Sequence, residues 1–152
     1  MRCFGWARSQ GSSLLHRKVS STIFSVEMTL QPRPVSRSES AVVTKAALRA
    51  ATRLGLTARA FATVVGLSEA TVSRMRAGDY TLRPGEKSFE LALLFIRLYR
   101  SLDAIVGGDD QVAATWLRNH NTLLDDKPLS QIQTVAGLMN VIQYLDARRA
   151  IV

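Results

Sequence analysis

The sequence predicts an all-α protein, and three observations support this class. Apolar residues recur at helical spacing between residues 41 and 146, no segment alternates as a strand would, and glycines or capping residues separate the periodic segments. The chain has 152 residues, of which 47% are hydrophobic and 21% charged. This length and composition are typical of one globular domain or of two very small ones.

Composition excludes several functional classes. No apolar run reaches about 18 residues, so we expect no membrane span. The single cysteine, Cys3, excludes an internal disulfide framework and fits a reducing compartment, which predicts a cytoplasmic protein. With His16 and His120 as the only histidines, neither a Cys/His metal site nor a Cys–His nucleophilic pair is expected. We therefore predict that the chain is not an enzyme and that it takes no cofactor and no small-molecule substrate.

Residues 1–40 are interpreted as a flexible N-terminal extension. Residues 1–27 are basic and rich in serine and threonine, with Glu27 as their one acidic group, which resembles a mitochondrial transit peptide. Alternatively Met28 is the true start, an interpretation that we favour because the following sequence looks bacterial. Residues 31–40 contain two prolines and three serines and lack periodicity, as a flexible arm does.

A first helix is predicted over residues 41–54, and Gly55 ends it. Lys45, Arg49 and Arg53 recur every four residues on the face away from its apolar stripe. Two shorter helices follow, each with a residue that can cap it and a glycine that ends it. Thr57 begins the first of them, Gly66 separates the two, and Ser68 and Gly78 bound the second.

A longer helix is predicted over residues 86–106. It is apolar on more than one face, which indicates burial on several sides and contributes to our expectation of a homodimer. Three shorter helical segments follow. They comprise a helix capped by Asp109 or Asp110 that carries Trp116 and Leu117, then residues 129–132 and residues 134–146, after a loop at residues 119–127.

The basic residues are concentrated in one part of the chain. Residues 41–83 carry seven basic and two acidic groups, whereas residues 84–152 carry seven basic and eight acidic groups. This contrast favours a polyanion-binding domain at 41–83 and a domain with another role at 84–152, although solvated surface charge would also explain it.

Residues 56–78 have the spacing of a helix-turn-helix. The small Ala62 allows two helices to cross closely, Gly66 supplies the positive φ of the turn, and Val72 points back to the core. The outward side chains of the second helix would meet base edges in the major groove. These are Glu69, Ala70, Thr71, Ser73 and Arg74.

This segment resembles the Xre/Cro-type helix-turn-helix family through the pattern L-T-x-x-x-x-A-x-x-x-G-x-S-x-x-T-V-S-R and the closing Gly78. The resemblance implies that Arg74 reads a guanine and that Ser68 caps the reading helix. Phosphate contacts are expected from Lys45, Arg49, Arg53, Thr57, Arg59 and Arg76. The sequence departs from the family at Ala58, where a glutamine is usual. A helical hairpin with a purely structural role is the alternative.

Residues 116–146 resemble the toxin-binding domain of the MbcA/ParS/Xre antitoxins through Trp-Leu-Arg, an asparagine loop, Pro-Leu and a helix begun by Gly137. The resemblance implies a type II antitoxin that neutralises a RES-domain, NAD-degrading toxin and represses its own operon. The toxin-binding residues expected from it are Trp116, Arg118, Asn121, Arg148, Arg149, Ile151 and Val152. The chain lacks the family's glycine near the C-terminus.

Simpler roles exist for several of these residues. Trp116 would serve as a core residue, Arg118 would pair with Asp125 or Asp126, and Arg148 and Arg149 would be favourable charges at a helix C-terminus. For the whole protein, the alternatives are a stand-alone Xre/Cro-type repressor without a toxin, whose residues 84–152 serve dimerisation, and an inhibitor that no longer reads DNA.

Overall fold

The structure is a computed structural model that describes residues 37–150. Within that range the chain forms seven helices, and its only β-type pairing is an isolated bridge between Asn121 and Asp126. The all-α prediction is therefore confirmed for the described residues. None of the helices in this range is long and apolar enough to cross a lipid bilayer.

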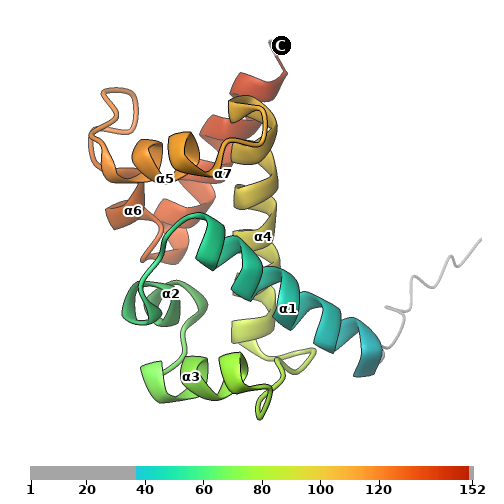
Figure 1. Ribbon diagram of the computed structural model, residues 1–152. Helices are drawn as coiled ribbons and strands as arrows, with labels where there is room; N and C mark the ends of the chain where they lie inside the picture. Colours follow the sequence, from blue (N-terminus) through green and yellow to red (C-terminus); the bar gives the residue numbers. More distant parts are fainter. Residues whose placement is uncertain (1–36, 151–152) are drawn as a thin grey trace, which may run out of the picture. The chain divides into compact units, whose positions relative to one another are not determined.

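The predicted order of helices is also observed (Figure 1). The helices are α1 (Arg37–Arg53), α2 (Ala58–Val65), α3 (Glu69–Ala77), α4 (Lys87–Val106), α5 (Asp110–Arg118), α6 (Pro128–Gln131) and α7 (Val135–Arg149).

The first helix begins earlier than its apolar pattern predicted. α1 starts at Arg37, so residues 37–40 are helical and do not belong to a flexible arm. Ser40 is buried, and its carbonyl accepts a hydrogen bond from the Thr44 hydroxyl at 2.8 Å. That hydroxyl in turn accepts the backbone N–H of Leu82 at 3.0 Å, which ties the first turns of α1 to the segment before α4. The extra helical turn thus depends on a tertiary contact that local periodicity does not reveal.

The turn between α2 and α3 follows the predicted chemistry. The Thr57 and Ser68 hydroxyls accept hydrogen bonds from the N–H groups of Ala60 and Thr71, both at 3.1 Å, and so cap α2 and α3. Gly66 ends α2 with φ +68°, a left-handed conformation that favours glycine. These local features place α3 across α2 in a helix-turn-helix.

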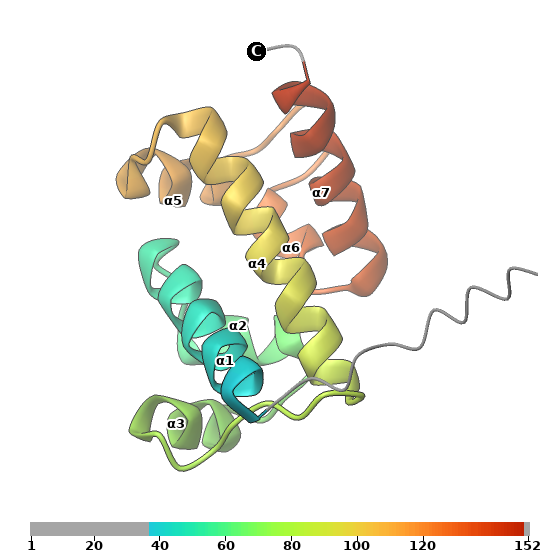
Figure 2. The same ribbon diagram turned by 90° about the vertical axis from the view of Figure 1, so that its right-hand side faces the viewer.

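α4 is the central helix of the core and packs against α1, α2, α5 and α7. In Figure 2 it runs between α1 on one side and α7 on the other. Phe95 is fully buried, and its ring lies 5.5 Å from that of Phe61 in α2. Intramolecular packing therefore uses most of the apolar surface that suggested an oligomer interface. On α4 only Leu93 and Ile105 remain as exposed large apolar residues.

The C-terminal helices are capped by side chains as well, at Asp109, which is one of the two predicted caps, and at Thr134, which was not predicted as one. Asp109 accepts hydrogen bonds from the N–H groups of Gln111 and Val112 at the start of α5. Thr134 accepts one from Gly137 at the start of α7. α7 then packs along α4 through one apolar face, which attaches the C-terminal half to the same core as the helix-turn-helix.

Candidate functional site

The outer face of α3 carries small or polar side chains, which suit a helix that enters a DNA groove. Ala70, Ser73 and Arg74 are exposed on it. Glu69 is exposed as well, and it forms an ion pair of 3.9 Å with Arg59 of α2, itself a solvent-exposed side chain. The predicted outward positions are thus accessible, with one exception.

The exception is Thr71, which is only 9% exposed and does not face outward. Its hydroxyl lies 2.9 Å from the Ser68 hydroxyl and accepts a hydrogen bond from the Arg74 guanidinium at 3.1 Å. The guanidinium also lies over the ring of Tyr80, 5.9 Å from its centroid. Thr71 therefore positions Arg74 instead of presenting its own side chain. Tyr80, which sequence reasoning missed, supports the same guanidinium.

The basic side chains of the helix-turn-helix occupy several different surfaces. Lys45 and Arg49 are exposed on α1. Arg49 and Arg76 line an open groove of about 460 Å³ between α1 and α3, together with Leu48, Thr52 and Arg53. Thr57 and Arg59 lie at the start of α2, where unpaired backbone N–H groups favour an anion.

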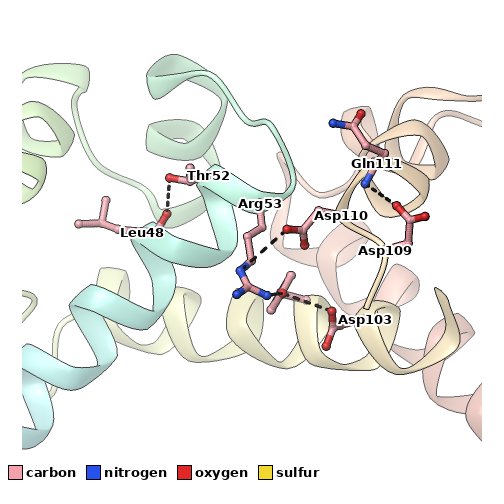
Figure 3. A network of polar contacts seen from close by, with 8 residues as sticks. Leu48, Thr52, Arg53, Asp103, Asp109, Asp110 and Gln111 are labelled. Atoms are coloured by element: carbon pink, nitrogen blue, oxygen red, sulfur yellow. Dashed lines mark hydrogen bonds and ion pairs between the residues drawn. The ribbon is translucent and has the colours of Figure 1, made fainter. Parts of the chain in front are cut away.

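Arg53 departs from the predicted phosphate-binding stripe (Figure 3). Its guanidinium donates a hydrogen bond to the Tyr99 hydroxyl at 3.0 Å and lies 4.0 Å from the Asp110 carboxylate. The Tyr99 hydroxyl donates to Asp103. The hydrogen bond with Tyr99, followed by the charges of Tyr99 and Asp110, raises the pKa of Arg53 above its ordinary value. Arg53 therefore connects the end of α1 to α4 and α5.

A second candidate site is an open groove of about 580 Å³ between α5, the following loop and α7. We call it the aromatic groove. Its lining residues are Gln111, Val112, Thr115, Trp116, Asn119, His120, Asn121, Thr122, Leu123, Tyr144 and Arg148.

Three planar side chains form a ladder along the aromatic groove. The Trp116 and Tyr144 rings stack with centroids 6.1 Å apart and an angle of 17° between their planes. The Arg148 guanidinium lies over the Tyr144 ring at 5.3 Å. Leu123 is 68% exposed and Val112 is 50% exposed at the same groove. Exposed apolar side chains beside aromatic rings and an arginine are typical of a protein-binding surface.

Asn121 shapes the loop at the edge of the aromatic groove. Its side-chain oxygen accepts hydrogen bonds from the N–H groups of Leu123 and Leu124, and its amide nitrogen donates to the Tyr144 hydroxyl at 3.3 Å. The structure thus brings together Trp116, Asn121 and Arg148, three of the predicted toxin-binding residues. Sequence reasoning missed Tyr144, which touches all three, because an isolated tyrosine on an apolar helix gives no local signal.

Arg118, a predicted toxin-binding residue, does not line the aromatic groove. Its guanidinium donates to the backbone carbonyl of Gly55 at 2.7 Å and to that of Ala114 at 3.2 Å. It forms no ion pair with Asp125 or Asp126 either. Arg118 therefore satisfies the carbonyl of Gly55, just beyond the C-terminus of α1, and ties α5 to the helix-turn-helix.

We predict that Arg118→Ala lowers stability by about 1 kcal/mol, because it removes a charge-assisted hydrogen bond that is partly accessible to water. The partner affinity of the aromatic groove should not change. Thermal unfolding would show a melting temperature lower by about 3–5 °C, whereas the exposed control Lys127→Ala should melt as the wild type does. Lost partner binding at unchanged stability would return Arg118 to the binding surface.

The remaining predicted toxin-binding residues lie at the end of the sequence, and the structure does not place them at the aromatic groove. Arg149 does not line the aromatic groove and instead lines another hollow between α4 and α7. Ile151 and Val152 lie outside the described residues. No group of three or more metal-ligating side chains occurs between residues 37 and 150.

A helix-turn-helix with an accessible α3, joined to a helical domain with its own groove, defines a DNA-binding protein with a second binding domain. Residues 33–97 match the family model of the antitoxin Xre-like helix-turn-helix domain, and residues 101–150 match the antitoxin Xre/MbcA/ParS C-terminal toxin-binding domain. The chain therefore belongs to the Xre-family antitoxins, a non-enzymatic family. The two matches meet within α4, the helix that supports both domains. No curated protein matches the chain significantly.

Proposed function

We propose that this antitoxin neutralises a RES-domain toxin that degrades NAD, and that it represses its own operon from the cytoplasm. The observation that carries the proposal is the presence of two different binding surfaces on one body, the outer face of α3 and the aromatic groove. The C-terminal sequence, which resembles MbcA/ParS/Xre antitoxins, supports a RES toxin as the partner.

The test is co-expression with the product of the neighbouring gene. We expect that product alone to deplete cellular NAD and arrest growth, and this chain to co-purify with it and restore NAD. A mobility shift with the promoter DNA should persist at moderate salt and depend on sequence. If nothing co-purifies but the promoter is still shifted, the chain is a stand-alone repressor.

For DNA reading we propose that Glu69, Ala70, Ser73 and Arg74 face base edges, with Thr71 holding Arg74. Thr57, Arg59, Arg76, Lys45 and Arg49 are proposed to contact phosphates. One short α3 covers a single half-site, so we also propose a homodimer on a palindrome whose half-sites lie about one helical turn apart. Light scattering should give twice 16.7 kDa. A footprint confined to one half-site would contradict the dimer.

We predict that Arg74→Ala costs about 1–3 kcal/mol of operator binding and relaxes the preference at one base pair. The reason is that a guanidinium pre-positioned by Thr71 and Tyr80 matches the two acceptors of a guanine. Arg74→Lys is the matched control, because it keeps the charge but loses the bidentate geometry. The measurement is titration against operators that vary at each position. An equal loss on every operator would instead make Arg74 a phosphate contact.

For toxin binding we propose contacts from Trp116, Asn121, Arg148 and Arg149, and from the tail residues Ile151 and Val152. Deleting residues 151–152 should leave operator binding unchanged but weaken neutralisation, because these two apolar residues are proposed to enter the toxin's dinucleotide pocket. Growth rescue and promoter shifts with the shortened chain would measure this. A fully protective shortened chain would exclude a role for the tail.

A further inference from the structure

A second groove, between α4 and α7, differs in chemistry from the aromatic groove. It has a volume of about 640 Å³, and we call it the arginine groove. Its lining residues are Leu93, Ile96, Arg97, Arg100, Ser101, Asp146, Arg149 and Ala150. It shares no lining residue with the aromatic groove, although the consecutive residues Arg148 and Arg149 of α7 each line one of the two.

The arginine groove carries an excess of positive charge, with three arginines and one carboxylate among its lining residues. Its one carboxylate, Asp146, is used within the fold: Arg97 donates to it at 2.6 Å and Ser101 donates to it at 2.8 Å. These bonds, that of Ser101 first, together with the charges of Arg97 and Arg149, lower the pKa of Asp146 below its ordinary value. Within the described part of the chain, Arg100 and Arg149 form no ion pair within 4.0 Å.

The arginine groove also has an apolar part. Leu93 is 45% exposed there, and Ile96 is half-buried beside it. Leu93 is one of only two large apolar residues of α4 that the core leaves exposed. Two arginines beside a partly exposed leucine suit a polypeptide segment that presents carboxylates next to an aliphatic side chain.

A second copy of this chain fits the arginine groove poorly. A dimer that reads a palindrome presents both α3 helices to the DNA, so its two-fold axis points from the DNA into the dimer. In Figure 1 α4 runs away from the end of the molecule where α3 lies, so this axis would be roughly parallel to α4. Pairing through this face would then set the arginines of one copy against those of the other. An antiparallel pairing of α4 would avoid that repulsion, but it would send the two α3 helices to opposite ends.

DNA bound to α3 is also remote from the arginine groove. In both views α3 lies at one end of α4, and the C-terminal turns of α7 lie towards the other end (Figures 1 and 2). The remaining occupant with matching charge is an acidic protein partner at the toxin-binding domain.

We propose that the arginine groove binds an acidic, aliphatic-bearing segment of the toxin, so that the toxin contacts α7 at two separate grooves. This inference rests on the proposed function and adds Arg100 and Leu93 to the toxin-binding surface. It also assigns Arg149 and Arg148 to different parts of the toxin.

The experiment measures toxin affinity of full-length variants by calorimetry, with the neighbouring gene's product as the probe. Arg100→Glu and Arg149→Glu should each weaken binding at least about tenfold, as for close charge pairs at interfaces. Lys87→Glu is the matched control, because it makes the same charge change on an exposed position of α4 outside the groove. It should bind as the wild type does.

The salt dependence of toxin affinity and the binding of promoter DNA distinguish the possible outcomes. The toxin affinity of the wild type should fall with added salt more steeply than that of a double variant that combines Arg100→Glu and Arg149→Glu. Promoter binding should be equal in all folded variants. Tight toxin binding by wild type and double variant alike would overturn this inference alone. A change in the double variant's oligomeric state at unchanged toxin affinity would assign the groove to a second copy. No toxin binding by the wild type would overturn the proposed function as well.

Discussion

Phe95→Ala is expected to destabilise the protein by about 3–5 kcal/mol, a large part of the stability of an ordinary domain. Phe95 is fully buried in α4, and its ring packs on Phe61 of α2. Since α4 also packs on α7, the cavity would weaken the DNA-reading half and the toxin-binding half together. We therefore expect a single unfolding transition, with its midpoint at a lower urea concentration than in the wild type.

The measurement is urea unfolding followed by circular dichroism and by Trp116 fluorescence, in a Trp6→Phe background. Phe95→Leu, which retains much of the side-chain volume, should lose only about 1 kcal/mol. Two separate transitions, with only one of them shifted, would show that α4 does not join the halves into one cooperative unit.

Gly137→Ala is expected to destabilise the protein by about 3 kcal/mol, although helix propensity alone predicts a gain. A Cβ atom on Gly137 would overlap the backbone carbonyl of Gln131 and lie 2.9 Å from the Thr134 hydroxyl. That carbonyl already accepts hydrogen bonds from the Thr134 N–H and hydroxyl, so it has little freedom to move. A loss of stability in Gly137→Ala would therefore show that close packing determines the effect, whereas a gain would show that helix propensity does.

Thermal unfolding and toxin affinity would test this variant, with the neighbouring Ala136→Ser as a control that should stay within about 0.5 kcal/mol of wild type. Below its melting temperature the variant should still bind the promoter, since α3 is distant from the α6–α7 corner. A melting temperature at or above that of the wild type would contradict the packing argument.

Local chemistry made the helices predictable. The caps at Thr57, Ser68 and Asp109 and the left-handed Gly66 act on neighbouring residues, so their effect can be predicted from spacing alone. The same is true of the exposed face of α3. The orientation of Thr71 cannot be predicted from spacing, because this residue lies at the border of the buried face, where packing and the bond to Arg74 determine it.

The binding surfaces were only partly predictable, because long side chains reach partners far away in sequence. Arg118 bonds to Gly55, 63 residues away, and Arg53 bonds to Tyr99, 46 residues away. No local pattern distinguishes these structural arginines from binding ones. The same holds for Tyr144, whose stacking on Trp116 becomes visible only when α5 and α7 lie together.

From the sequence we could predict the helices, the ends that caps and glycines set, and the helix-turn-helix with its excess of basic residues, since these depend on periodicity, capping residues and charge. The start of α1 could not be predicted, because it depends on the contact between Thr44 and Leu82. Which side chains share a surface depends on how the helices pack. In the folded protein Arg53 and Arg118 form hydrogen bonds with distant parts of the chain. Arg100 and Arg149 line the same groove as Leu93. Trp116, Tyr144 and Arg148 stack on one another. The physical reason is that α4 packs on four helices at once, so residues distant along the chain become neighbours.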